Sequence, residues 1–424
     1  MKFKLKETKF SYKIIYSVRV FLIVLDGAGI GASKDCHNFN DPSTVNTIFN
    51  SLKKSKEDGL IIKLPNLSKL GLHKILKIKN PQIGYEELKE VGFSIDSQII
   101  SSYGIMEEKS LGKDTITGHW EISGLIVEKG FDTFESFPQE LIETFEKQIN
   151  RKTIGNKAAS GTEIIKEFGE EHIKTGKPII YTSADSVFQI AAHIEVISID
   201  ELYTICEVAY NLINEKGYRI ARVIARPFAG ENGNFYRLND KRKDFSVPPP
   251  STTILDVFYN SKLEVITVGK ISDIFANRSI TKSYKVSGNV DIFNKVLELS
   301  KTNFEGLIFA NLVDFDTIYG HRQDYRGWAK SLEEFDKIVF RLIENLKKDD
   351  ILIITADHGN DPTDQSTDHT REDVPLIIIG IKEDNFLGIK KSFRYVSFII
   401  QELFKDKLTQ RIQIEEFEGE KIWN

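Results

Sequence analysis

The chain has 424 residues, of which 41% are hydrophobic and 28% charged, so it is long enough for two or three domains with a large core. A formal net charge of −5 and a pI near 6.0 give no reason to expect nucleic acid or an anionic membrane as a partner. The cysteines, Cys36 and Cys206, stand far apart, which excludes a disulfide framework and a thiolate zinc site and favours a cytoplasmic location.

The N-terminus is rich in lysine and leads into the apolar run Val18–Leu25. A membrane-spanning helix needs about 18 apolar residues, and this shorter run ends at Asp26 without a signal-peptide cleavage site. We interpret the run as a buried strand, preceded by an N-terminal extension, residues 1–17, of unassigned role. The turn that follows, Gly27–Gly31, lacks the spacing of a dinucleotide-binding fingerprint.

The segment Gly112–Glu121 is rich in hydroxyl side chains and runs into a helix predicted from Trp120 onward. A hydroxyl at such a junction lies where backbone N–H groups and the helix dipole favour anions. The local sequence alone favours a simpler interpretation, in which Asp114, Thr115 or Thr117 only caps the helix.

Residues 131–248 differ in character from their surroundings, and we interpret them as an inserted α+β domain that ends at a stiff run of three prolines. Amphipathic helices are predicted at Pro138–Gln148 and Ile199–Lys216, and strands at Pro178–Tyr181 and Arg222–Ala225.

Basic side chains gather near the end of this inserted segment. A solvated surface is the default interpretation of such charges. Arginines next to Pro227 or within Gly233–Arg237 lie in apolar or turn sequences, where the guanidinium fork suits a phosphate group. The set comprises Arg222, Arg226, Arg237, Lys241, Arg242 and Lys243.

After the inserted segment, strands and helices alternate. The predicted strands are Leu263–Val268, Gly306–Val313 and Ile351–Thr355. Trp328–Leu346 repeats apolar residues at three- and four-residue steps, as an amphipathic helix does. This alternation predicts an α/β core with a mostly parallel sheet between helices, formed by residues 1–130 and 249–424.

Acidic and imidazole side chains follow the carboxyl ends of these strands. They are Asp26, Asp314 or Asp316, His321, Asp357, His358 and His369. The carboxyl ends of parallel strands meet at one edge of a sheet, beyond which ligands bind. Six or seven oxygen and nitrogen ligands exceed what one tetrahedral ion needs, so we expect two divalent cations, for which Mn²⁺, Zn²⁺ and Mg²⁺ are all suitable. Such a site suits phosphoryl transfer. The hydroxyl that acts as nucleophile would belong to Thr115 or Thr117.

The motifs that carry these residues resemble those of the phosphopentomutase family, within the alkaline phosphatase superfamily. The resemblance extends from about Arg19 onward. It is based mainly on GKDTITGHWEISG (112–124), GNKAASGTEI (155–164), YTSADSVFQIAAH (181–193), RVIARPF (222–228), NLVDFDTIYGH (311–321) and TADHGNDPTDQSTDHTRE (355–372). It implies an alkaline-phosphatase-like core with the inserted segment as a cap.

The resemblance also implies an isomerase that interconverts α-D-ribose 1-phosphate and D-ribose 5-phosphate, and the 2-deoxyribose pair. The nucleophile would be Thr115, phosphorylated during a reaction that passes through a pentose 1,5-bisphosphate. Manganese would be the usual ion, with a sugar 1,5- or 1,6-bisphosphate as activator. The cap would close over the metals and exclude water, which would otherwise release free phosphate.

The resemblance assigns ligands and substrate contacts residue by residue. One cation would be held by Asp26, Thr115, Asp357 and His358, and the other by Asp316, His321 and His369. The substrate would be bound by Ser183, Asp185, Arg222, Ile224, Arg237 and Lys270. We expect small pentose phosphates as the only partners, and a monomer or weak oligomer.

Four positions depart from the family pattern: Gly27, Leu111, Ile194 and Gln323. None is an expected ligand, so they concern substrate affinity and cap closure rather than the class of reaction. The alternatives are a metal-dependent phosphatase, another phosphosugar or phosphoglycerate mutase of the superfamily, and a metal-binding protein without activity.

Overall fold

The computed structural model describes residues 18–183 and 186–420. The expected N-terminal extension, residues 1–17, and the expected substrate ligand Asp185 lie outside the described residues. Within the described ranges, none of the helices has both the length and the apolar character needed to span a bilayer.

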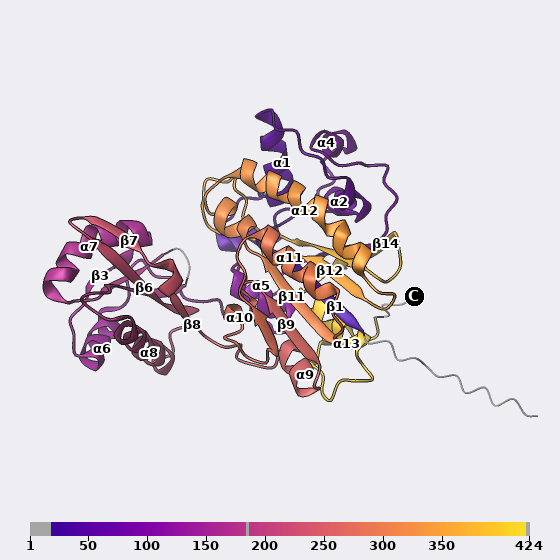
Figure 1. Cartoon of the computed structure of the whole chain (residues 1–424). Helices are drawn as coiled ribbons and strands as arrows, with labels where there is room; N and C mark the ends of the chain where they lie inside the picture. Colours follow the sequence, from indigo (N-terminus) through magenta and orange to yellow (C-terminus); the bar gives the residue numbers. More distant parts are fainter. Residues whose placement is uncertain (1–17, 184–185, 421–424) are drawn as a thin grey trace, which may run out of the picture.

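A mixed sheet of eight strands organises the larger part of the described chain, in the order β10-β9-β11-β1-β12-β13-β2-β14 (Figure 1). Its central strand β1 (Arg19–Leu25) pairs in parallel with β11 (Gly306–Leu312) and β12 (Ile351–Thr355), and all three are buried along their length. The remaining strands are β2 (Ser102–Met106), β9 (Glu264–Val268), β10 (Lys282–Tyr284), β13 (Val374–Ile379) and β14 (Asn385–Lys390). Because only β13 runs antiparallel to its neighbours, the predicted α/β fold with a mostly parallel sheet is confirmed.

Helices cover both faces of this larger sheet (Figure 1). One layer contains α1 (Thr47–Glu57), α2 (Pro65–Lys69), α11 (Asn289–Ser300) and α12 (Tyr325–Asn345). The other layer contains α5 (Thr115–Ile122), α9 (Ile254–Asn260), α10 (Ile271–Ile274) and α13 (Tyr395–Leu403). The short helices α3 (Leu72–Lys79) and α4 (Tyr85–Glu90) lie in the first quarter of the chain. The apolar stripe that predicted α12 is buried, with Trp328, Leu332 and Val339 fully enclosed.

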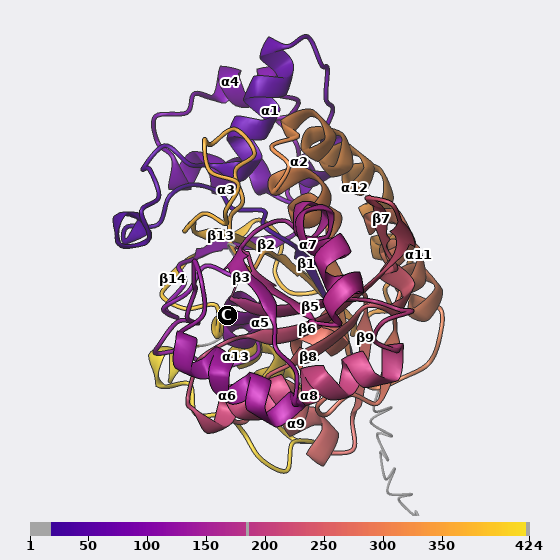
Figure 2. The ribbon, with the colours of Figure 1, turned by 90° about the vertical axis from the view of Figure 1, so that its left-hand side faces the viewer.

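A smaller sheet lies beside the larger one and stands in front of it in Figure 2. Its order is β3-β4-β5-β6-β7, with β8 paired to β6. The strands are β3 (Ile154–Ala158), β4 (Ile179–Thr182), β5 (Val187–His193), β6 (Arg222–Glu231), β7 (Asn234–Arg237) and β8 (Lys243–Ser246). Ile180 and Ile190 pack against α6 (Gln139–Ile149) and α8 (Ile199–Glu215), whereas Tyr181 packs with α7 (Gly161–Thr175) on the other face.

All strands of the smaller sheet come from the segment predicted as an insertion, although the exact domain limits stay a prediction. The smaller sheet lies towards the side of the larger sheet that carries α5 and α10 (Figure 1). A direct contact joins the two parts, because β8 packs against α10.

Candidate active site

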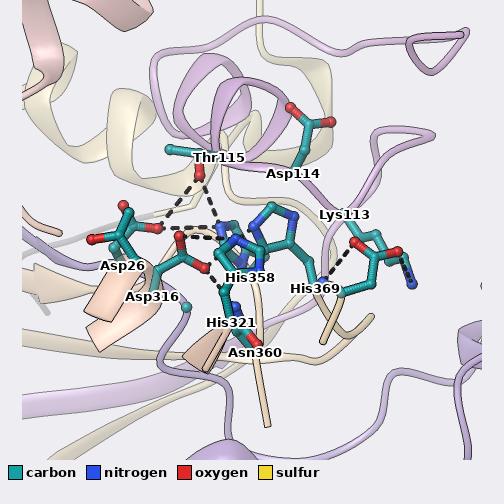
Figure 3. Close-up of polar contacts among 12 residues, drawn as sticks. Asp26, Lys113, Asp114, Thr115, Asp316, His321, His358, Asn360 and His369 are labelled. Carbon is teal, nitrogen blue, oxygen red and sulfur yellow. Dashed lines mark hydrogen bonds and ion pairs between the residues drawn. The ribbon is translucent and has the colours of Figure 1, made fainter. Parts of the chain in front are cut away.

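Three acidic side chains lie together at the carboxyl ends of adjacent strands, and Figure 3 shows two of them, Asp26 and Asp316. Asp26 directly follows β1, and Asp357 follows β12. Asp316 lies after β11 in a π-helical turn, Phe315–Gly320. Since β11, β1 and β12 are neighbours in the sheet, their ends bring these carboxylates to one place, where all three are buried.

The side chains form two groups whose nitrogen and oxygen atoms lie within 4.8 Å of one another. One group contains Asp316, His321 and His369, and the other contains Asp26, Asp316 and His358. His369 Nε2 lies 3.3 Å from one oxygen of Asp316, and His321 Nε2 lies 3.4 Å from the other. The carboxylate of Asp316 therefore lies between the groups, whereas the sequence analysis assigned it to one ion alone.

Asp357 lies at the edge of the second group, with Oδ2 3.4 Å from His358 Nε2. Its other oxygen accepts a hydrogen bond of 3.1 Å from the main-chain N–H of Gly27. Gly27 has a φ of 72°, and a Cβ there would lie 3.1 Å from the Cβ of Asn360. The left-handed backbone and the crowding explain why glycine suits this position.

The charges of this cluster are only partly balanced by the side chains themselves. Burial, together with repulsion from Asp357 and Asp316, raises the pKa of Asp26. Burial also opposes ionisation of Asp316, but the imidazoles of His369 and His321 hold its pKa well below its usual range. Despite its burial, His358 has a pKa well above the ordinary value because of the carboxylates of Asp357 and Asp26.

This donor set fits divalent cations. Buried carboxylates that repel each other need positive charge nearby, and oxygen and imidazole nitrogen are ligands that Mn²⁺, Zn²⁺ and Mg²⁺ accept. Among the described residues, His369 Nε2 has no hydrogen-bond partner although it is buried. An imidazole nitrogen left in this way beside a carboxylate is available to a metal ion.

Helix α5 presents a threonine to this cluster. Asp114 is its N-cap, and one carboxylate oxygen accepts hydrogen bonds from the main-chain N–H groups of Ile116 and Thr117. Because of this cap the helix begins at Thr115, and the prediction of a start near Trp120 was wrong.

The three capping candidates from the sequence have different roles in the structure. Asp114 caps the helix, and the hydroxyl of Thr117 donates to the second oxygen of Asp114, at 2.6 Å. The hydroxyl of Thr115 instead lies 3.2 Å from His358 Nε2 and 3.5 Å from Asp26 Oδ1 (Figure 3). Of the two candidate nucleophiles, only Thr115 faces the ligand-type side chains.

Two buried asparagines support the carboxylates and were missed by the sequence analysis. Asn360 Nδ2 donates to Asp316 Oδ1 at 2.6 Å, and Asn311 Nδ2 donates to Asp26 Oδ2 at 2.9 Å. Both asparagines lie within the sequence motifs on which the family resemblance is based. An asparagine near the end of a predicted strand was therefore the local signal that could have identified them. Asp314, which the sequence offered beside Asp316, accepts instead from the main-chain N–H of Asn289, at the start of α11.

The expected substrate ligands lie mainly on the smaller sheet. Ser183 follows β4, Arg222 and Ile224 lie at the start of β6, and Arg237 ends β7. Lys270 instead precedes α10 on the larger sheet. The start of β6, with Arg222 and Ile224, pairs with β8, and β8 contacts α10.

Comparison with known proteins identifies the superfamily and the family to which the chain belongs. Residues 18–405 match the model of the metalloenzyme superfamily, and the chain belongs to that superfamily. The phosphopentomutase of Thermotoga maritima is 51% identical over 391 residues, which cover 91% of this chain and 96% of that protein. The phosphopentomutase of Caldanaerobacter subterraneus subsp. tengcongensis is 50% identical over 390 residues, covering 91% and 94%. Within the superfamily the chain belongs to the phosphopentomutase family, and it is an isomerase.

Among solved structures, the PH0037 protein of Pyrococcus horikoshii matches with a TM-score of 0.47 and 14% identity, over 94% of this chain and 100% of that one. The family resemblance inferred from the sequence motifs is confirmed by the curated relatives.

Proposed function

We propose that this enzyme interconverts α-D-ribose 1-phosphate and D-ribose 5-phosphate, and the corresponding 2-deoxyribose phosphates, with Thr115 as the carrier of the phosphoryl group. Membership of the family supports the substrates. The observation that best supports the carrier is the position of the Thr115 hydroxyl, 3.2 Å from His358 Nε2 and 3.5 Å from Asp26 Oδ1.

The clustered acids and histidines are proposed to hold two divalent cations, most simply Mn²⁺. Asp26, Asp357, His358 and Thr115 would hold one, and Asp316, His321 and His369 the other. When bound, such ions lower the pKa of the attacking hydroxyl and neutralise charge on the phosphate oxygens. The support in this chain is a sulfur-free donor set, buried except for the partly exposed His321, with Asp316 between its two groups.

The proposed reaction begins with phosphate on Thr115 Oγ1. A free hydroxyl of the pentose phosphate attacks this phosphorus, the bond from phosphorus to Thr115 Oγ1 breaks, and a pentose 1,5-bisphosphate forms. The proton lost by the sugar hydroxyl is balanced by the one that Thr115 regains. Thr115 then attacks the other phosphate of the bisphosphate, which returns the group to the enzyme and releases the isomeric monophosphate. A sugar 1,5- or 1,6-bisphosphate would act as activator by supplying the first phosphoryl group.

The smaller sheet is proposed to bind the phosphate that does not react and to shield the intermediate from water. The residues proposed for this are Ser183, Asp185, Arg222, Ile224 and Arg237, with Lys270 from the larger sheet. Arginine suits this role because its planar fork pairs with phosphate oxygens in either orientation of the sugar. Exclusion of water separates a mutase from a phosphatase.

Small pentose phosphates are proposed as the only binding partners, without nucleic acid or membrane, and the protein as a monomer or weak oligomer. The net charge of −5 supports the absence of a polyanionic partner. A cytoplasmic location is proposed from cysteine usage, since Cys36 and Cys206 are both free thiols in the structure.

The test supplies ribose 1-phosphate, Mn²⁺ and a trace of ribose 1,5-bisphosphate, and measures ribose 5-phosphate and inorganic phosphate over time. We expect ribose 5-phosphate to dominate. Dominant release of inorganic phosphate would replace the mutase proposal with a phosphatase. Mass spectrometry of the same sample should find phosphate on the peptide that contains Thr115, and an active protein that never carries it would exclude the phosphothreonine route.

A further inference from the structure

His119 is a fully buried histidine on α5, one helical turn after Thr115, and the proposed reaction gives it no role. Its Nδ1 lies 2.9 Å from the main-chain oxygen of Thr115 and also 2.9 Å from Oδ2 of Asp357. Because both neighbours are oxygen acceptors, Nδ1 carries the ring proton. Its hydrogen bond goes to the main-chain oxygen of Thr115, whereas Oδ2 of Asp357 is in close polar contact with Nδ1 but accepts no hydrogen bond from the described residues. One ring nitrogen therefore contacts both the backbone of the proposed nucleophile and a proposed metal ligand.

The rest of the ring is held by packing. It stacks on Phe309 of β11, with the ring centres 5.7 Å apart and the planes inclined by 21°. Within the part of the chain that the structure describes, His119 Nε2 has no hydrogen-bond partner. A buried polar atom without a partner is costly, and an apolar ring would fill the same space without that cost. The contribution that requires histidine here is therefore the donor at Nδ1.

The main chain of α5 also packs directly on Asp357. A Cβ added to Gly118 would lie 2.1 Å from the carbonyl oxygen of Asp357, so only glycine allows this approach. The two carboxylate oxygens of Asp357 then have separate neighbours: Oδ1 accepts a hydrogen bond from the N–H of Gly27, and Oδ2 lies 2.9 Å from His119 Nδ1. This carboxylate thus has a polar contact on each side, one of them a hydrogen bond.

We propose that His119 is a positioning residue for phosphoryl transfer: its Nδ1–H is hydrogen-bonded to the main-chain oxygen of Thr115, and the close contact of Nδ1 with Oδ2 of Asp357 keeps that carboxylate and the first turn of α5 in one fixed relation. In that relation the hydroxyl of Thr115 and the carboxylate of Asp357 face the same place. The inference rests on the proposed function and extends it to a side chain that is fully buried behind Thr115 and Asp357. Partners that orient metal ligands in this way typically contribute about 10- to 100-fold in metal affinity or activity.

Three substitutions separate the donor from the packing. His119→Asn can place an amide N–H near the position of Nδ1, His119→Gln places its amide near the position of Nε2, and His119→Leu supplies neither. We expect His119→Asn to keep kcat within about threefold of the wild type. We expect His119→Gln and His119→Leu to lose about 10- to 100-fold in kcat with little change in KM.

The second readout is Mn²⁺ affinity, measured by calorimetry on the protein without substrate. The dissociation constant for Mn²⁺ should rise about 10-fold or more in His119→Gln and stay near the wild-type value in His119→Asn. Phe309→Leu is the matched control, because it removes the stacking but leaves Nδ1 in place. It should lower the melting temperature while changing Mn²⁺ affinity less than His119→Gln does.

A purely structural role for His119 predicts a different pattern, in which all three His119 variants lose thermal stability together and His119→Asn rescues nothing. That pattern, or wild-type kcat and Mn²⁺ affinity in His119→Gln, would overturn the proposal. If His119→Leu does not fold, the comparison of His119→Asn with His119→Gln is sufficient to test the proposal. The wild-type protein in the same assay tests the proposed function separately, since a wild type that forms no ribose 5-phosphate refutes the reaction while the Mn²⁺ affinities still test the positioning.

Discussion

The guanidinium of Arg371 forms a fully buried ion pair with Glu108, with Nη1 2.5 Å from Oε2. The same Nη1 donates to the carbonyl oxygen of Gly112, at 2.6 Å. Arg371 comes two residues after His369, whereas Glu108 and Gly112 begin the loop that leads to Thr115. This ion pair therefore joins the segment of one proposed metal ligand to the loop of the proposed nucleophile.

Substitution of Arg371 should destabilise the protein strongly. Arg371→Met would leave the Glu108 carboxylate buried without a counter-charge, and burial already raises the pKa of Glu108 well above its usual value. We expect the free energy of unfolding to fall by about 3–5 kcal/mol in urea denaturation. Glu108→Gln should cost less, since the amide keeps an acceptor and Asp35 still pairs with Arg371. Equal losses in the two variants would contradict this account.

Gly118→Ala should reduce activity by moving α5. The added methyl group would lie 2.1 Å from the carbonyl oxygen of Asp357, so the helix and Thr115 must shift. A displacement of about 1 Å can cost about 100-fold in rate, and we expect a loss of that order in kcat. The control is Gly84→Ala, where the added Cβ meets only Glu87 Oε2, at 3.5 Å, and kcat should not change. Wild-type kcat in Gly118→Ala would show that α5 does not need this close contact.

The strand ends of the site could be predicted from the sequence because their physical signal is local. A strand buried on both faces is a continuous apolar run, and a carboxylate at its end stands out. The strand at Ile351–Thr355 has the predicted limits, and β1 begins one residue after the predicted Val18. Adjacent parallel strands then bring Asp26 and Asp357 together by topology alone.

Other features of the site depend on contacts between segments that are distant in the sequence, so the local sequence does not predict them. The first residues of α5 include Thr115, Thr117 and Gly118, which are poor helix formers, and their helical conformation is supported by the Asp114 cap and by packing on Asp357, just after β12. The position of Asp316 between two ligand groups depends on a π-helical turn, which periodicity does not predict. The substrate contacts inferred from the family resemblance stay predictions.

Thr115→Ala should abolish phosphoryl transfer while largely preserving Mn²⁺ binding. The substitution removes the hydroxyl that lies next to His358 and Asp26, whereas every carboxylate and imidazole ligand remains. Conversion of ribose 1-phosphate measures transfer, and calorimetry measures Mn²⁺ binding. Thr117→Ser is the matched control, because a serine hydroxyl can keep the hydrogen bond to Asp114. Near-wild-type activity in Thr115→Ala would move the nucleophile elsewhere, most simply to Thr117.

Arg237→Ala and Arg222→Ala should weaken substrate binding more than they weaken the fold. A hydrogen bond to a charged group contributes about 1.5–3 kcal/mol, so the apparent KM should rise by roughly 10-fold or more. Arg237 is exposed at the end of β7, and its loss should leave the melting temperature nearly unchanged. Lys241→Ala removes an exposed cation close by and serves as the control. An unchanged KM in both arginine variants would remove the smaller sheet from substrate recognition.

The pH dependence of stability should reveal a buried acid outside the active site. Asp336 of α12 is buried, and its Oδ1 accepts hydrogen bonds from the main-chain N–H groups of Asn66 and Leu67, at the start of α2. Burial raises the pKa of Asp336 to about 6. In the unfolded chain the pKa of aspartate is about 3.9. Between these values the folded protein binds more protons, so this carboxyl lowers stability as pH rises from about 4 to about 6.

Asp336→Asn removes that titration while keeping an oxygen acceptor for the start of α2. The free energy of unfolding of the variant, relative to the wild type, should therefore increase as pH rises from about 4 to about 6 and stay constant above that range. Urea denaturation at a series of pH values measures the difference. Glu334→Gln, an exposed position on the same helix, should give a curve parallel to the wild type. A parallel curve for Asp336→Asn as well would mean that the Asp336 carboxyl titrates in the folded protein as it does in the unfolded chain.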